Sequence, residues 1–242
     1  MKNIYLLGLL LAFISSCATI NPTITMGDDP DPNPKAYVKL KDGTLIQPKT
    51  FTTTSNKIIA DGKSYNQKKI RACSDGRVQY IANPNGYLIP LKYTGKLNVY
   101  SLNMVYVKTD MRTGVEHTHS KTFEYFTNGN DFLIPLDYKP LSKVILPGTP
   151  PFDYLKLSKS KDRIGGAKMI GGIACILGGF ATVVSGFSPQ GINGTRAAIG
   201  GAIAAGGFGL IVSGAITKRQ ARQNRRRAVA CYNGVLPPIT KK

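Results

Sequence analysis

Two long uncharged stretches near the C-terminus constrain the fold of this chain more than any other feature. Residues 169–187 and 197–217 are runs of 19 and 21 uncharged residues, both rich in glycine and alanine. Because a helix rises about 1.5 Å per residue, each run spans about 30 Å, the thickness of a bilayer core. A turn-forming segment around Pro189 separates the runs, and Thr195 is the candidate N-cap of the second helix. The pattern predicts an α-helical transmembrane hairpin over residues 164–217.

Glycine recurs every seven residues in both expected helices, at Gly165, Gly172, Gly179, Gly186, Gly200, Gly207 and Gly214. Lipid gives no hydrophobic drive to pack helices together, so close backbone approach along small residues supplies the attraction. The spacing therefore predicts a glycine zipper, with a homo-oligomer formed through the hairpin. A flexible linker or a buried soluble hairpin is the alternative. Both fit poorly, since linkers are rich in serine and charge, and a helix apolar all round needs a larger protein around it.

The first 16 residues have the parts of an export signal: Lys2, an apolar run over residues 4–14, and small residues before Cys17. The apolar run is too short to span a bilayer. Residues 14–17, Ile-Ser-Ser-Cys, resemble a bacterial lipobox. That resemblance implies a diacylglycerol on the Cys17 sulfur, cleavage that leaves Cys17 first, and fatty chains such as palmitate in the membrane. One alternative is an ordinary cleavable signal peptide with an incidental cysteine. Another is that the lipobox is incidental and the β region faces the cytosol.

Residues 17–35 then form a proline- and aspartate-rich segment. Prolines at alternate positions from Pro30 to Pro34 prevent a helix or an interior strand, because each fixes φ and removes a donor. We expect an extended tether behind the lipidated cysteine. Ala18 resembles the residue type that lets lipoproteins continue to the outer membrane, which favours that membrane over the inner one.

Residues 36–140 have the pattern of β structure. Asp-Gly and Asn-Gly pairs recur at short intervals and supply the positive φ angles of tight hairpins. Short β-branched and aromatic runs lie between them, among them residues 97–100 and 104–107 as two separate strands. About eight strands are enough to bury one core as a small sandwich or barrel. The fold class expected for the whole chain is a mainly β N-terminal domain followed by the helical hairpin.

A formal net charge of +19 points to an anionic partner. Export makes lipid head groups or envelope polymers the expected partner, and no aromatic and basic nucleic-acid motif is present. Residues 141–163 are expected as a linker and basic amphipathic lead-in to the membrane. Residues 218–242 are expected as a basic tail that contacts anionic lipid through Lys218, Arg219, Arg222, Arg225, Arg226 and Arg227. Positive-inside logic would place this tail in the cytoplasm, whereas insertion after export resolves that conflict.

The sequence indicates no catalytic site and no cofactor. His117 and His119 are two apart on an expected strand, so both imidazoles face one side and are weak metal candidates. No further ligand stands at a helpful spacing, and no nucleophile motif occurs. Cys73 and Cys231 could pair in an oxidising compartment, although two free thiols are expected.

Cys17 and the paired glycine helices together resemble the glycine-zipper two-helix lipoproteins of the bacterial envelope, such as the SlyB type and the rickettsial surface-antigen lipoproteins. The resemblance does not extend to the β domain, which those small proteins lack. It implies a non-enzymatic envelope lipoprotein with a structural or interaction role. The alternatives are a β module that binds or hydrolyses cell-wall or glycan material, and an accessory subunit of an export or assembly complex.

Overall fold

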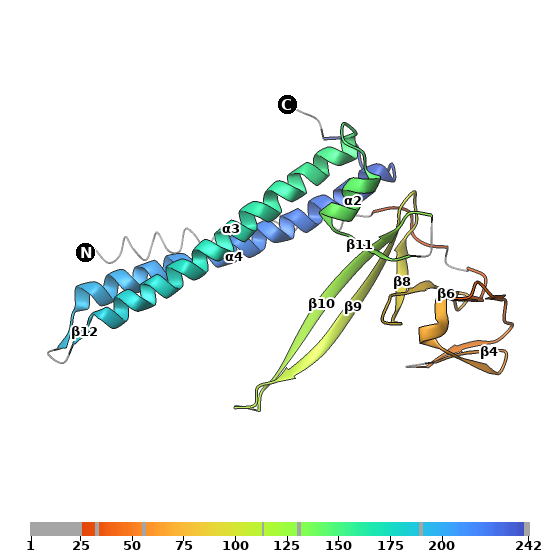
Figure 1. Cartoon of the computed structure of the whole chain (residues 1–242), viewed down its shortest axis with the longest axis horizontal. Coiled ribbons are helices and arrows are strands. Elements are labelled where there is room, and N and C mark those ends of the chain that lie inside the picture. The colour runs from red at the N-terminus through yellow and green to blue at the C-terminus, as the bar shows by residue number, and fades with distance from the viewer. Residues whose placement is uncertain are drawn as a thin grey trace. The chain divides into compact units, whose positions relative to one another are not determined.

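The structure is a computed structural model that describes residues 26–31, 34–54, 57–112, 114–129, 132–188 and 191–239 (Figure 1). The signal region and Cys17 lie outside these residues. The chain divides into two compact units. Residues 156–224 form a helical unit, and residues 26–155 together with 225–239 form a β unit. Two helices run from one unit into the other, because α3 spans Pro150–Ser185 and α4 spans Gly194–Tyr232.

The β unit is built on an open antiparallel half-barrel, in agreement with the mainly β domain expected from the sequence. Its eight strands have the order β11-β10-β9-β8-β7-β6-β1-β2, so β6 to β11 form a meander and β1 is added beside β6. Their bounds are β1 Tyr37–Leu40, β2 Leu45–Ile46, β6 Ile70–Ser74, β7 Gln79–Ala82, β8 Leu88–Tyr93, β9 Asn98–Thr109, β10 Glu116–Thr127 and β11 Ile134–Pro135.

A second antiparallel sheet of three strands packs against one end of the first. It contains β3 (Phe51–Thr53), β4 (Lys57–Ala60) and β5 (Lys63–Asn66), and a 3-10 turn at Gln67–Lys69 leads from it into β6. Ile58 of β4 and Val38 of β1 are fully buried in one shared cluster. Sandwich packing is therefore confined to this end of the sheet.

The half-barrel buries side chains on both faces because its strands alternate. On one side of the sheet, Ile89 and Tyr100 belong to a cluster made of strand residues and the adjoining Leu133. On the other, Val99 and Phe126 pack against helical residues, which come from α2 (Tyr138–Val144), the first turns of α3 and the last turns of α4. The largest core of the β unit thus unites segments from the middle and the end of the chain.

The glycines of the five Asp-Gly and Asn-Gly pairs in residues 36–140, which are Gly43, Gly62, Gly76, Gly86 and Gly129, all have positive φ, as tight reversals require. Residues 97–100 and 104–107 were expected as two strands, but residues 98–100 and 104–107 instead lie in β9, an uninterrupted strand of twelve residues. No turn interrupts it because β10 pairs with it along its whole length.

The helical unit is an antiparallel hairpin. The ends of α3 and α4 are joined through a short β pair, β12 (Phe187–Ser188) with β13 (Gly191–Ile192). Asn193, rather than the expected Thr195, caps α4, because its Oδ1 accepts a hydrogen bond from the Arg196 N–H at 3.2 Å. Helix α4 begins at Gly194, so Thr195 already lies inside it.

Both helices extend past the uncharged runs. Helix α3 contains the lead-in expected at residues 141–163 from Pro150 onward, and Leu155 of that segment is fully buried in the β unit. Helix α4 continues to Tyr232, so most of the segment expected as a tail is helical, and Ala228 and Val229 are buried. At the other end of the chain, Met26, expected in the tether, is 1% exposed in the same core. These segments are ordered because their apolar residues complete that core.

Candidate functional site: a glycine-packed helical hairpin

Six of the seven glycines that recur every seven residues lie between the two helices of the hairpin, and the seventh, Gly186, follows the end of α3 at Ser185. A Cβ added to Gly172 would lie 2.5 Å from the Gly207 carbonyl oxygen, and one added to Gly179 would lie 2.5 Å from the Gly200 oxygen. Gly165 and Gly214 approach in the same way. Real Cβ atoms do not occupy such distances, so only glycine permits this backbone approach.

A second set of glycines in the same helices has open surroundings. A Cβ added to Gly171 or Gly178 would meet nothing within 4 Å, although each stands next to a glycine that is tightly packed. Gly201 and Gly206 of α4 have equally open surroundings. The seven-residue glycines therefore hold the hairpin together within one chain, and the neighbouring glycines lie on its outer surface.

Most large apolar side chains of the hairpin point outward. The helix backbones meet at the glycines, with the half-buried Met169, Val183 and Ile211 beside these contacts. The large apolar residues more than 60% exposed on α3 and α4 are Ile170, Leu177, Phe180, Val184 and Phe208. A soluble protein has the opposite arrangement, with its large apolar side chains inside.

Helices α3 and α4 are both long and apolar enough to cross a membrane by length and composition. Only 11% and 17% of their most apolar stretches are buried inside the structure. The core helix of a soluble protein would be mostly buried, and neither helix is near the N-terminus as a signal sequence would be. The described part of the chain thus leaves this apolar surface uncovered.

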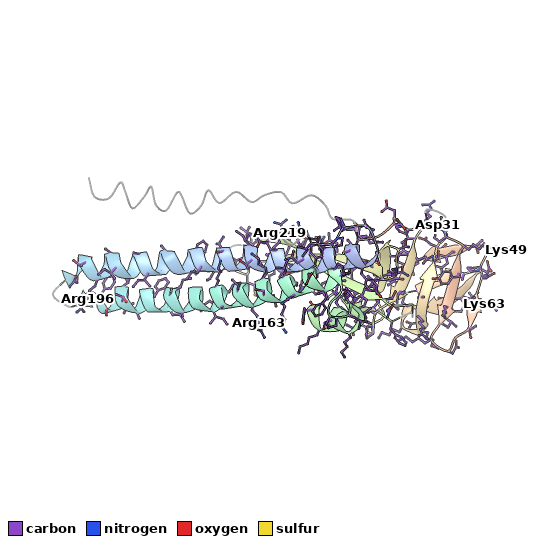
Figure 2. The ribbon with its side chains drawn as sticks, turned by 90° about the horizontal axis from the view of Figure 1, so that it is seen from above. Asp31, Lys49, Lys63, Arg163, Arg196 and Arg219 are labelled. Carbon is purple, nitrogen blue, oxygen red and sulfur yellow. The ribbon has the colours of Figure 1, made fainter. Side chains whose placement is uncertain are left out.

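Charged residues stand at the two ends of the apolar surface. Figure 2 shows Arg196 at the turn end of the hairpin, with Arg163 and Arg219 toward the other end. Sequence reasoning missed a polar link near that end, where Lys168 Nζ lies 3.0 Å from Ser213 Oγ across the two helices. In the sequence, the only indication of this link is the position of Lys168 directly before the uncharged run.

The six basic residues expected to contact lipid are divided between the two units, three in the helical unit and three in the β unit. Arg219 and Arg222 are exposed on α4 in the helical unit. Arg226 is used by the fold of the β unit, since its Nε donates to Glu124 Oε2 at 3.0 Å and its Nη2 lies 2.8 Å from Oε1. Arg225 lies 3.7 Å from Asp137 in the same unit. Lys218 packs beside Gly165, and Arg227 is half-buried.

Asn233, which sequence reasoning also missed, joins three distant segments of the β unit. Its Oδ1 accepts from the Leu97 N–H at 3.0 Å, and its Nδ2 donates to the carbonyl oxygens of Leu97 at 3.1 Å and Met26 at 2.6 Å. Gly95 must be glycine here, because an added Cβ would lie 2.4 Å from Asn233 Nδ2. In the sequence, the position of Asn233 directly before Gly234 indicated only the end of a helix.

His117 and His119 lie on the same side of β10, with ring centroids 6.5 Å apart. The His119 ring stacks on Tyr106 at 5.5 Å. Among the described residues, no group of three or more His, Cys, Asp or Glu side chains could hold a metal ion.

Cys73, Cys175 and Cys231 are free thiols in the structure. Cys73 lies in the core shared by the two sheets. Burial, with a smaller contribution from Asp75, raises the pKa of the Cys73 thiol from 9.0 to about 12. This thiol is therefore unreactive at neutral pH.

Comparisons of the chain with protein-family models, with curated proteins and with solved structures give no match.

Proposed function

We propose that this protein is a non-enzymatic lipoprotein of the bacterial cell envelope, in which the α3–α4 hairpin inserts into a membrane and holds the β unit at its surface. Acyl chains on Cys17 provide a second attachment, with the outer membrane as the favoured location. The exposed Arg219 and Arg222 contact anionic head groups beside the hairpin, each contributing up to about 1 kcal/mol. The β unit then serves a structural or interaction role.

The observation that carries this proposal is the inverted distribution of side chains in the hairpin. Glycine backbones meet between the helices, and most of the bulky apolar residues face outward over the length of a bilayer core. In water this arrangement exposes the apolar surface and buries little, whereas in lipid the outward side chains are solvated and the glycine contact holds the helices together. The two uncharged runs and the charges at their ends fit the same environment.

Self-association of the hairpin belongs to the same proposal, although it cannot use the seven-residue glycines, which already pack against each other within the chain. A second hairpin would pack on the outer surface, where Gly171, Gly178 and Gly201 leave room for close approach.

The two proposed attachments can be tested separately in bacterial cells. Cys17→Ala removes the acylation site, and Leu177→Arg places a charge on the exposed middle of α3, at an insertion cost of about 2.5 kcal/mol or more. We expect each single variant to stay in the membrane fraction after alkaline carbonate washing, and the double variant to be released. Mass spectrometry of the mature N-terminus should detect an acylated Cys17 in the unaltered protein.

Leu45→Arg is the matched control, since Leu45 is an exposed leucine of the β unit. Combined with Cys17→Ala, it should leave the protein in the membrane. Release of the unaltered protein by carbonate would contradict hairpin insertion, and an unmodified Cys17 would contradict the lipoprotein assignment.

A further inference from the structure

The β9–β10 hairpin extends beyond the rest of the half-barrel as a two-stranded arm (Figure 1). Strands β9 and β10 pair over twelve residues each, from Asn98 opposite Thr127 to Thr109 opposite Glu116. Strand β8 pairs with β9 only at Val99 and Tyr100, and β11 pairs with β10 only at Tyr125 and Phe126. Side chains 103–109 and 116–122 are exposed on both faces.

An isolated two-stranded hairpin is at best marginally stable in water, and a free strand edge is a template for another strand. The two edges of this arm differ in chemistry. Along β9, residues 101–107 (Ser-Leu-Asn-Met-Val-Tyr-Val) carry no charge and no proline. Along β10, Glu116 and Lys121 lie in the exposed part, together with both histidines. Charged residues, lysine above all, block strand addition, so the open edge is that of β9.

Strand addition at β9 suits a second copy of the same strand. In an antiparallel pair centred on Val105, that residue faces its own counterpart, and Met104 faces Tyr106 of the other copy. Lys108, the nearest charge, then lies opposite Leu102 of the other copy. The two Lys108 residues are offset by six residues, or about 20 Å along the strand, which exceeds the screening length of about 8 Å in physiological salt. Because residues 101–107 carry no charge, this part of the β9 edge offers a charged partner no complementary charge.

We infer that the outer edge of β9, from Ser101 to Thr109, pairs with the same edge of a second copy of this chain to form a continuous four-stranded sheet. The contact is isologous, because one surface serves both molecules, and it closes after two copies. Main-chain hydrogen bonds give it strength, and the apolar side chains 104–107 pack across it on both faces. It does not depend on the membrane hairpin.

Cysteine scanning of the full-length protein in detergent tests this pairing. Cys175 and Cys231 are first replaced by alanine, and Met104, Val105, Tyr106 or Ser120 is then changed singly to cysteine. Opposed residues of antiparallel strands have Cα atoms about 4.5 to 5.5 Å apart, within reach of a disulfide. Only the residue at the two-fold centre faces its own counterpart. We therefore expect one of positions 104, 105 and 106 to form disulfide-linked dimers several-fold more than the other two.

Ser120→Cys is the matched control, because Ser120 is the β10 residue opposite Val105 and is also exposed. It should give only the background of the parent protein without an arm cysteine. A second pair of variants, combined with the cysteine at the centre, places lysine on either edge. Val107→Lys should reduce the dimer several-fold, whereas Thr118→Lys, on the opposite strand at the same level, should not.

Equal cross-linking at positions 104, 105 and 106 would indicate parallel stacking and overturn the inference. Equal cross-linking at Ser120 as well would indicate random collision, and a disulfide to another protein would indicate another occupant of the edge. Absence of dimers above the parent background at every position would also overturn it.

Discussion

At the scale of single residues, adjacent glycines in the hairpin have different roles. Gly172 faces the Gly207 carbonyl oxygen across the helix pair, and Gly171 faces open space. A sequence of two glycines does not say which one faces the other helix. The seven-residue period indicated it, because a repeat of seven keeps one face of a helix in register with its neighbour.

We predict that Gly172→Leu separates the two helices and that Gly171→Leu does not. The added side chain at Gly172 meets backbone atoms, which cannot move aside as a flexible side chain can, so the loss should be at least the 1–3 kcal/mol typical of overpacking. At Gly171 the change should be neutral or slightly favourable, because leucine favours helix more than glycine does. Thermal unfolding in detergent, followed by helical circular dichroism, compares them. Equal melting temperatures would contradict the packing.

The Cys73 thiol leads to a prediction about pH. Its pKa rises from 9.0 to about 12 on folding, first because of burial and second because of Asp75. We expect almost no alkylation of Cys73 at pH 8 in the folded protein and ready alkylation in denaturant, as read by mass spectrometry. The folded state holds this proton more tightly, so its contribution to stability is complete below pH 9 and is lost as pH rises from 9 towards 12. Rapid labelling of native Cys73 at pH 8 would show that the site opens.

At the scale of elements, α4 carries two groups of arginines with different roles. Arg222 is exposed in the helical unit, and Arg226, one turn later, holds Glu124 of β10 through two contacts. Composition alone predicts one basic segment. The helix separates the two groups because it enters the β unit between them, and residues 225–239 belong to that unit.

The two arginines should respond differently to alanine substitution. Arg226→Ala leaves the Glu124 carboxylate, whose side chain is 11% exposed, without this cation. We expect a loss of about 1–3 kcal/mol in stability, measured by denaturant unfolding with tyrosine fluorescence. Arg222→Ala should leave stability within about 0.5 kcal/mol and weaken binding to anionic vesicles up to about fivefold. A greater loss of stability in Arg222→Ala than in Arg226→Ala would contradict the roles given to these two arginines.

At the scale of the whole molecule, the β unit is discontinuous in sequence. Its core contains Leu155 from the first turns of α3 and Val229 from the last turns of α4. Asn233 adds hydrogen bonds to Leu97 and Met26. The boundary expected at residue 140, shortly after the last strand, therefore removes part of the core.

Two shortened chains starting at residue 26 test this organisation. A chain ending at residue 155 lacks Val229 and Asn233, so we expect it to aggregate. A chain in which a flexible linker replaces residues 159–221 keeps both and loses the apolar surface, so it should be soluble and melt cooperatively. The free-energy cost of closing a flexible loop changes little with the length of the loop. Size-exclusion chromatography and thermal unfolding distinguish the two, and equal behaviour would contradict a discontinuous unit.

The features that depend on local pattern could be predicted from the sequence. The turn glycines, most strands between residues 37 and 136, and the hairpin of two apolar helices follow from φ preferences, alternation and hydropathy, which act over a few residues. The seven-residue period also pointed to the glycine contact. Three further features could not be predicted in this way: α4 returns into the β unit, Asn233 joins Leu97 to Met26, and β9 continues through residues 98–109. Each depends on a partner distant in the chain, and such pairing leaves no periodic mark in the sequence around either residue.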